Sequence, residues 1–504
     1  MKKLDYIQFI VIDLFCGAGG TTLGFEQAES DYDDMYRFLK SYGITPPTDR
    51  ETFFRISKVI ACVNHDHLAI TSHWKNHPDV KHFEEDIRLL NPYGDLKLHV
   101  DHYRKLYPHA KVILWASLEC TNFSKAKGGQ PRDADSRTLA EHLYKYIDAL
   151  NPDYIKIENV VEFMAWGPLD ENGKPVSKKA GTDWLKWRAE ICKRGYYDDW
   201  KQLNSADFGA YTSRNRLFGV FAKNGLPIAW PTPTHHKKPE TVTVPVKRWE
   251  PVKKVLDFDD EGLSIFNRKK PLSTKTMQRL FMGCVKHIAG GKEVFLSKYY
   301  SGNPQHKNIT VDQPAGAITC PVIATQNRLG KVKAEFIDLQ FSSGKRNQSI
   351  EEPLGAITTV PKSKLVQADF FIDKQFSGDD NHYIVNPSWG GNSGSVEEPC
   401  HVVIARQDKA PLYVITCSEG PVAVPVYEDD CEWTIKLKEF MALYNICDIK
   451  MRMLKVLELK KIQGFPADYI LLGNQTDQKK FIGNAVHPLV PKFWIEAFNK
   501  RLAV

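Results

Sequence analysis

The stretch Val11–Glu26 reads Val-Ile-Asp-Leu-Phe-Cys-Gly-Ala-Gly-Gly-Thr-Thr-Leu-Gly-Phe-Glu and takes an apolar strand into a glycine turn. A helix is expected to begin near Thr21. Gly17, Gly19 and Gly20 allow the backbone to approach a ligand closely, at the carboxyl end of a strand where α/β folds bind cofactors. The pattern is not GxGxxG, so a dinucleotide is not the first expectation. Taken alone, the motif also fits a tight strand-to-helix turn without a ligand.

The first 223 residues alternate short β-branched runs with helical segments, which is typical of a parallel sheet wrapped by helices. Several of the runs are apolar throughout, as strands buried on both faces should be. The expected strands are Phe9–Phe15, Val59–Val63, Val112–Ala116, Tyr154–Glu158 and Leu217–Ala222, with a helix over Leu139–Leu150.

Composition places the chain among ordinary globular proteins. It has 504 residues, 42% of them hydrophobic and 26% charged, enough for two or three domains. Its ten cysteines are scattered without a CxxC pair, which predicts a reduced cytoplasmic protein with neither disulfides nor a metal site. No apolar stretch approaches the roughly 20 residues that span a bilayer, so no membrane association is expected.

The composition and charge of the sequence change after Lys223. Residues 225–330 hold 16 Lys/Arg against 8 Asp/Glu, a net charge of +8, whereas the whole chain carries +7. Such a surface can bind phosphates, and a solvated lysine-rich face is an equal alternative. A repeat follows in which Val294–Gly302 leads to Gln313–Thr319, Phe336–Gly344 to Glu352–Thr358, and a weaker copy runs from Phe371–Gly378 to Glu398–Val403. Each unit predicts two strands around a Gly/Asn-rich turn, so this insert is expected to be β-rich, and Lys455–Val504 returns to helical texture.

Polar residues follow several of the expected strands. Asn64 and Asp86 lie at strand ends, where such groups bind ribose hydroxyls and an adenine amine. Cys120 follows the strand Val112–Ala116, and nearby Lys125 and Lys127 favour a reactive thiolate. By itself, Cys120 equally fits a small buried structural residue.

Two further segments carry charges to a strand edge. Glu158 closes an apolar strand, where burial favours the protonated form and makes the carboxyl a candidate proton donor. Arg214 and Arg216 precede another strand at alternating positions, so both guanidinium groups can reach one face. A solvated edge is the alternative for this arginine pair.

Taken together and in this order, the segments resemble the cytosine carbon-5 DNA methyltransferase family of bacterial and phage type. The matches lie within residues 8–223 and 452–498. They comprise the cofactor loop Asp13–Gly20, the nucleophile loop with Cys120, Phe123 and Ser124, the triad Glu158–Val160, the arginine motif Asn204–Gly209 with Arg214 and Arg216, and the closing motifs Gln463–Tyr469 and Gly483–Val486.

The resemblance implies an α/β, Rossmann-like, S-adenosyl-L-methionine-dependent methyltransferase domain with a large inserted β-rich target-recognition domain. Residues 1–223 and 452–504 would form the catalytic domain and 224–451 the insert. The catalytic residues would be Cys120, Glu158, Arg214 and Arg216; the cofactor residues Asp13, Phe15, Cys16, Gly17, Gly19, Gly20, Asn64, Asp86, Asn484, Ala485 and Val486; and the DNA contacts Ser124, Arg137, Gln305, Lys307, Lys345 and Arg346.

In the implied reaction, the Cys120 thiolate adds to carbon 6 of a flipped cytosine and carbon 5 takes the methyl group. Glu158 would bind or protonate ring nitrogen 3, while Arg216, with Arg214, would steady the oxygen at position 2. The segment around Asn484 is expected to fold back beside the cofactor loop. The expected partner is double-stranded DNA, acted on by a monomer, with a cognate restriction endonuclease acting separately.

Three features depart from the family pattern. Glu119 stands where proline usually precedes the nucleophile, Asn64 replaces an acidic ribose ligand, and Glu29–Ser57 is a long insert. Because Glu119 would raise the thiol pKa if it pointed inward, two alternatives stay open: a catalytically weak DNA-binding protein and an enzyme for a modified pyrimidine or cofactor. A tRNA cytosine methyltransferase of the same family is a third alternative, which the large basic insert disfavours.

Overall fold

The structure is a computed structural model that describes most of the chain. The described ranges are 3–45, 53–118, 139–168, 180–257, 262–266, 268–284, 425–444 and 446–502, together with strands between 333 and 419 and a few single positions. Two compact units divide it: Met1–Asp257 with Val396–Pro411 and Leu454–Val504, and Phe258–Ser395 with Leu412–Met453.

Within the described residues, an eight-stranded sheet of order β2-β3-β1-β5-β6-β8-β7 frames the first unit, and β4 pairs with β3. The strands are β1 (Lys3–Leu14), β2 (Glu29–Ser30), β3 (Phe53–Asn64), β4 (Lys81–Glu84), β5 (Lys111–Ser117), β6 (Tyr154–Asn159), β7 (Tyr196–Asn204) and β8 (Asn215–Lys223). Pairs among β1, β3, β4, β5 and β6 are parallel, whereas β2, β7 and β8 pair antiparallel. The five predicted strands and the Rossmann-like fold class are confirmed.

Two boundaries differ from the prediction. β1 ends at Leu14 because Phe15 has a φ of 60°, a left-handed conformation that a strand cannot contain. The predicted helix over Leu139–Leu150 begins only at Leu143. Before that residue, the backbone bonds span three positions, as in His142 N–H to Leu139 O, and so form turns rather than α-helix.

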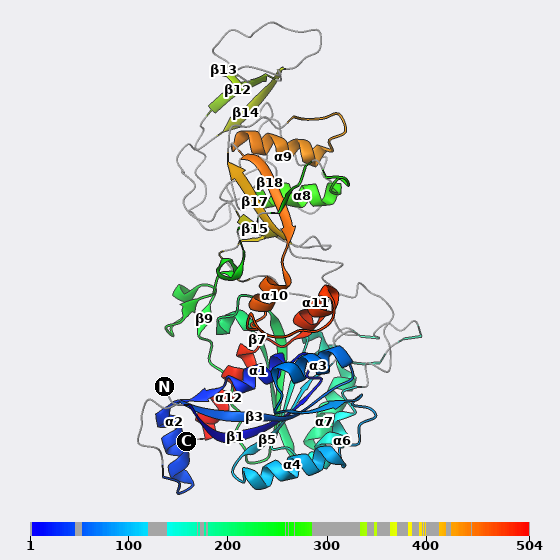
Figure 1. Ribbon diagram of the computed structural model, residues 1–504, viewed down its shortest axis with the longest axis vertical. Coiled ribbons are helices and arrows are strands. Elements are labelled where there is room, and N and C mark those ends of the chain that lie inside the picture. The colour runs from blue at the N-terminus through cyan, green and yellow to red at the C-terminus, as the bar shows by residue number, and fades with distance from the viewer. Residues whose placement is uncertain are drawn as a thin grey trace. The chain divides into compact units, whose positions relative to one another are not determined.

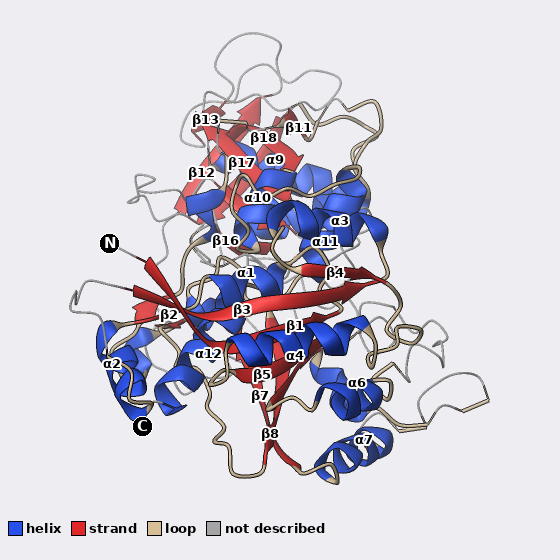
Figure 2. Ribbon diagram, turned by 60° about the horizontal axis from the view of Figure 1, so that its bottom comes forward, coloured by secondary structure: helices blue, strands red, loops and turns tan. Residues whose placement is uncertain are grey.

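Helices cover both faces of this sheet (Figures 1 and 2). They are α1 (Gly20–Glu26), α2 (Tyr32–Ser41), α3 (His67–Asn76), α4 (Asp95–Leu106), α6 (Leu143–Leu150), α7 (Thr182–Cys192), α10 (Val456–Ile462), α11 (Gln475–Asn484) and α12 (Leu489–Leu502). Alternation along β1 separates two cores: Ile10 and Ile12 pack with α4, α6 and α7, while Phe9 and Val11 pack with α1, α2 and α12. Figure 1 shows α4 on the opposite side of the sheet from α1 and α3.

The insert within Glu29–Ser57 extends the sheet and one of its cores. Its first residues form β2, which pairs with β3, and its helix α2 buries Met35 and Phe38. The C-terminal helix reaches the same place, since Asn499 Nδ2 donates to Ser30 Oγ over 2.8 Å. The insert therefore covers an edge of the sheet and joins it to α12.

The first unit continues to Asp257, beyond Lys223 where the insert is predicted to begin. The reason is packing: Trp230 stacks on Trp494 with ring centroids 4.8 Å apart, and Trp249 Nε1 donates to Asp207 Oδ1 over 2.8 Å. This stretch carries the short strands β9 (His235–His236) and β10 (Lys247–Arg248), which pair with each other.

In the second unit, the described strands form one five-stranded sheet of order β11-β18-β17-β15-β16 and one three-stranded sheet of order β13-β12-β14. Its elements are β11 (Leu263–Ser264), α8 (Thr274–Gly283), β12 (Lys333–Leu339), β13 (Asn347–Ser349), β14 (Ser363–Asp369), β15 (His382–Val385), β16 (Ser393–Ser395), β17 (Tyr413–Glu419), α9 (Glu432–Leu443) and β18 (Ile446–Met453). Leu280, Phe440 and Ile449 belong to its core. Across the part of the chain that the structure describes, every helix is too short or too polar to cross a bilayer.

Gly24→Ala should destabilise the first unit. A methyl group is ordinarily favourable inside a helix by up to about 1 kcal/mol. At Gly24, however, the added Cβ would collide with the Pro488 carbonyl oxygen and lie 2.6 Å from Pro491 Cγ. We expect the free energy of unfolding in urea to fall by about 3 kcal/mol, the upper range for overpacking.

Gly43→Ala is the matched control, because its φ is 68° and no atom lies within 4 Å of the added Cβ. Backbone strain alone should cost roughly 1 kcal/mol there. An unchanged or increased stability of Gly24→Ala would contradict the packing of α1 on the start of α12.

Candidate active site

The carboxyl ends of the parallel strands meet at one edge of the sheet, where the predicted site residues converge. From β1 the chain moves to β3 on one side, and it later enters β5 on the other side of β1. This reversal is the topological switch point at which open α/β sheets bind ligands. β8 runs antiparallel, so its first residues reach the same edge, with Leu217 opposite Asn159.

The glycine turn after β1 is open on one side and tightly packed on the other. Gly17 has a φ of 54°, and no atom lies within 4 Å of a Cβ built there. Gly20 is different, because its added Cβ would lie 2.5 Å from the Val486 carbonyl oxygen. Gly19, with a φ of 103°, similarly meets the Tyr469 hydroxyl. Among these three glycines, Gly17 is the one whose added Cβ would meet no described residue, so its side of the turn is open to a ligand.

The C-terminal segment supplies the packed side of the turn. The Tyr469 hydroxyl donates to the Ala18 carbonyl over 2.6 Å, and Gln463 Nε2 donates to the Ala485 carbonyl over 2.8 Å. Val486 is buried against Gly20, whereas Asn484 is exposed. The predicted fold-back of this segment beside the cofactor loop is confirmed.

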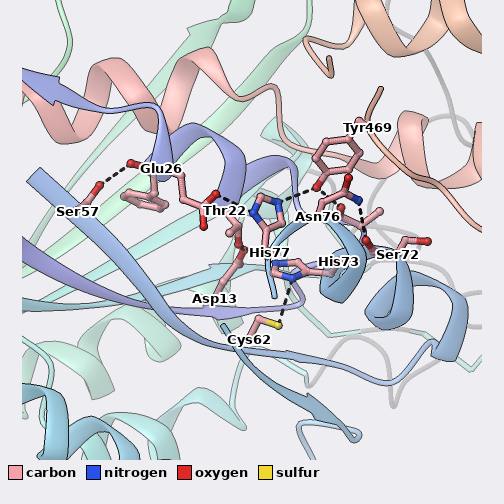
Figure 3. A network of polar contacts seen from close by, with 12 residues as sticks. Asp13, Thr22, Glu26, Ser57, Cys62, Ser72, His73, Asn76, His77 and Tyr469 are labelled. Atoms are coloured by element: carbon pink, nitrogen blue, oxygen red, sulfur yellow. Dashed lines mark hydrogen bonds and ion pairs between the residues drawn. The ribbon is translucent and has the colours of Figure 1, made fainter. Parts of the chain in front are cut away.

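A buried polar network lies beneath the turn (Figure 3). Thr22 Oγ1 donates to Asp13 Oδ2 over 3.0 Å and lies 2.9 Å from His73 Nε2. His77 joins Glu26 to the Tyr469 hydroxyl through contacts of 2.8 and 2.9 Å. Sequence reasoning missed these two histidines, because nothing in the sequence shows that α3, with His73 in its last turn and His77 as its C-cap, packs beneath the glycine turn.

Burial dominates the electrostatics of two predicted cofactor residues in this region. It raises the pKa of Asp13 to about 8, and the bond from Thr22 only partly opposes this shift. Burial also raises the pKa of the Cys16 thiol well above its usual value. Both side chains are thus enclosed beneath the loop, and their role toward a cofactor stays a prediction.

Asn64 and Asp86 occupy the ends of β3 and the segment after β4. Asn64 is half-buried, and its Oδ1 accepts from the Asp66 backbone N–H over 2.9 Å. The Asp86 carboxylate accepts from Arg88 Nε over 3.0 Å and from the second guanidinium nitrogen over 2.7 Å. These hydrogen bonds lower the pKa of Asp86, which keeps it an ionised acceptor.

Glu158 and Arg216 form a close pair at the end of β6. Glu158 is only 6% exposed, and its Oε1 lies 3.5 Å from Arg216 Nε. Burial raises the pKa of Glu158, while the charges of Arg214 and Arg216 pull it down. The carboxyl can therefore hold a proton more readily than an exposed glutamate, beside a fixed positive charge.

Arg214 connects the mouth of β8 to the C-terminal segment. Its guanidinium donates to the Gly483 carbonyl over 3.0 Å, and the side chain is buried. His487 is buried nearby, and burial together with the charge of Arg214 lowers the pKa of His487 to about 3. Arg214 and Arg216 thus point to different partners on one edge.

The remaining predicted site residues lie outside the described residues. They are Cys120, Ser124, Arg137, Gln305, Lys307, Lys345 and Arg346, together with the departure Glu119. The last described residue before Cys120 in the sequence is Leu118, which is buried just after β5. β5 lies between β1 and β6, so it separates the glycine turn from Glu158.

The family model for C-5 cytosine-specific DNA methylase matches residues 9–500. The chain belongs to this family. The match extends through the insert as well as the two parts that carry the motifs.

Curated relatives match just under half of this chain. The Type II methyltransferase M.XorII of Xanthomonas oryzae pv. oryzae is 28% identical over 232 residues, 45% of this chain and 43% of the relative. The Type II methyltransferase M.AgeI of Thalassovita gelatinovora is 28% identical over 225 residues, 44% of this chain and 42% of the relative. The chain thus spans less than half the length of these two relatives. A solved Dnmt2 variant of Spodoptera frugiperda is 13% identical, with a TM-score of 0.44 over 97% of this chain and 99% of that one.

His487 should make the stability of this family member depend on pH. Its folded-state pKa is depressed from 6.5 to about 3, so the unfolded chain binds a proton that the folded chain does not. The resulting stability is present above about pH 6.5 and is lost as the pH falls toward 3, by up to roughly 1.4 kcal/mol per pH unit.

The variant His487→Asn keeps an acceptor for the Leu489 N–H, which bonds His487 Nδ1 over 3.3 Å. Urea unfolding at pH 7, 6 and 5 should show a steeper loss of stability in the wild-type chain than in this variant. If the free energy of unfolding falls equally with pH in the two proteins, His487 is not held in its neutral form.

Proposed function

We propose that this chain is a DNA (cytosine-5-)-methyltransferase that acts through a covalent Cys120 adduct. The observation that supports this most directly is the buried Glu158–Arg216 pair at the end of β6. β6 is the neighbour of β5, and the chain that continues from β5 carries Cys120. Family membership supplies the reaction class for this arrangement.

The reacting groups divide the work as follows. The Cys120 thiolate forms a bond to carbon 6 of a flipped cytosine, and the ring's double-bond electrons become available at carbon 5. Glu158 holds a proton at ring nitrogen 3 as charge develops there, and Arg216 neutralises the oxygen at position 2. After methylation, carbon 5 loses its proton and the ring expels the thiolate.

S-adenosyl-L-methionine, when bound, supplies the methyl group from its sulfonium. The open side of Gly17 fits such a ligand, because no atom of the described residues lies within 4 Å of a Cβ built there. Asp86 is an ionised acceptor suited to the adenine amine, and Asn64 ends the neighbouring strand, where a ribose would lie. Phe15, Ala485 and Val486 complete this proposed site.

We further assign double-stranded DNA as substrate and residues 224–451 as the target-recognition part. The net charge of +8 over residues 225–330 supports this assignment, because phosphate contacts supply most non-specific DNA affinity. Residues 1–223 and 452–504 would provide catalysis. We also propose that the chain is a cytoplasmic monomer with a separately acting restriction endonuclease as its counterpart. The two relatives named above are Type II methyltransferases.

Covalent trapping tests the proposal. Sequencing of methylated DNA from cells that express the chain would first identify the target. A duplex with 5-fluorocytosine at that target should then give a denaturant-resistant adduct in the presence of S-adenosyl-L-methionine. Cys120→Ala should abolish the adduct, whereas Cys192→Ser, at a half-buried cysteine on α7, should retain it. Duplex binding without an adduct would favour the catalytically weak alternative, and an adduct on tRNA alone would favour the tRNA enzyme.

Substitutions of Arg214 and Arg216 should have different effects. Arg216→Ala should slow adduct formation by about 10²–10³-fold, the loss typical of one charge-stabilising donor, with little change in stability. Arg214→Ala should instead lower the free energy of unfolding by about 2 kcal/mol, because it removes the buried bond to Gly483. Rapid-quench trapping and urea unfolding separate the effects. A stable but inactive Arg214→Ala, with an active Arg216→Ala, would reverse the assignment.

A further inference from the structure

Three soft donor atoms gather under the glycine turn, on the face of the sheet that α3 covers. They belong to Cys16 in the turn, Cys62 on β3 and His73 on α3, and all lie within 4.8 Å of one another. The three side chains are buried, with exposed fractions of 6%, 0% and 0%. Neither the fold nor the proposed methyl transfer requires two thiols and an imidazole at this spot.

His82 brings a fourth donor to the same place. It is the parallel partner of Cys62 across β3 and β4, so both side chains point to one face of the sheet. His82 Nε2 lies 2.8 Å from His73 Nδ1, and Cys62 Sγ lies 3.7 Å from the same nitrogen. His73 Nδ1 thus contacts both Cys62 and His82. Figure 3 shows the contact with Cys62.

A chain of hydrogen bonds to the buried Asp13 side chain fixes the orientation of His73. The Thr22 hydroxyl has one proton and donates it to Asp13, so toward His73 Nε2, 2.9 Å away, it must act as acceptor. The proton of neutral His73 is then on Nε2, which leaves the lone pair of Nδ1 facing Cys62 and His82. Histidine ligands of metals are oriented in this way, by an outer hydrogen bond that ends on a carboxylate.

We propose that Cys16, Cys62, His73 and His82 form a metal site that takes a zinc-like divalent cation. Two thiolates and two imidazoles are a common tetrahedral donor set for structural Zn²⁺. Bond lengths of about 2.3 Å to sulfur and 2.0 Å to nitrogen place such donors roughly 3.3–3.8 Å apart. The longest separation within the Cys16, Cys62 and His73 set, 4.8 Å at most, needs a contraction of about 1 Å to reach that geometry. His82 contacts His73 but lies outside this set, so its side chain has to move further toward the two sulfur atoms on metal binding.

The cation would attach the glycine turn to three other elements. Cys16 belongs to the turn, and the other ligands come from β3, α3 and β4. Two thiolates would balance a divalent charge, so the buried site would be neutral once the thiol protons leave. Such a site would support the cofactor loop from behind without touching the open side of Gly17.

Metal content tests the proposal in the full-length chain without reference to methyl transfer. Protein expressed with added zinc and purified in the absence of chelators should retain about one zinc per chain by mass spectrometry. Replacement by Co²⁺ should give the visible bands of a tetrahedral site and a thiolate charge-transfer band. Cys62→Ser should weaken Zn²⁺ binding by at least about 100-fold, and His82→Asn by about 10-fold or more.

Cys192→Ser is the matched control, because Cys192 lies on α7 and outside the cluster, and it should bind zinc like the wild type. Circular dichroism confirms that each variant is folded, and the wild-type zinc and Co²⁺ measurements need no variant. Absence of zinc and of a Co²⁺ thiolate band in the wild type would overturn the site, as would a Cys16–Cys62 disulfide in reduced-buffer preparations. Inactivity on DNA with zinc bound would count against the proposed function alone.

Discussion

Contact between two backbones is the constraint on which this structure depends. Gly20 and Gly24 of α1 lie against the Val486 and Pro488 carbonyls, and any side chain at either position would enter space that the returning chain occupies. Close-packed interiors cannot absorb such an addition without moving a backbone. The approach of these two segments also brings the Tyr469 hydroxyl to the Ala18 carbonyl and the Gly483 carbonyl to Arg214. One steric requirement thus fixes the positions of both the glycine turn after β1 and the sheet edge that carries Arg214.

Much of the fold could be predicted because strands that are buried on both faces have continuous apolar sequences. β3, β5, β6 and β8 contain their predicted strands, β1 contains its own except for Phe15, and motif order placed Glu158 and Arg216 on one edge. Local backbone preferences could not be read as well: Phe15 adopts a positive φ, and the turns before Leu143 shorten α6. The network of His73, His77 and Tyr469 was not predictable, because it depends on how α3 and the C-terminal segment pack beside the glycine turn. The same holds for the zinc ligands, which share no sequence spacing.

Buried ionisable groups in the first unit are mostly shifted toward their neutral forms. Burial raises the pKa of Asp13 and Glu158, and it lowers the pKa of Lys156 and His487. Lys156 Nζ lies 4.1 Å from the Trp494 ring centroid and 3.8 Å from that of Phe498. Attraction to these aromatic faces offsets part of the cost of burying the charged form of Lys156. Guanidinium groups resist deprotonation, so Arg214 and Arg216 keep their charge in this environment. The candidate edge therefore combines fixed positive charge with a buried acid whose pKa is raised, as the proposed stabilisation of a developing negative charge would need.

The return of the chain to its starting point has a consequence for biosynthesis. β1 and α1 leave the ribosome well before Leu454–Val504, the part of the chain that covers Gly20 and Gly24. At typical translation rates of about 5–20 residues per second, the interval between the two is on the order of tens of seconds. During that time, the apolar face that Phe25 and Val11 share with Trp494 has no α12 to cover it. The nascent first unit is therefore an expected client of ribosome-associated chaperones, whereas the second unit, encoded entirely between Phe258 and Met453, emerges before that cover arrives.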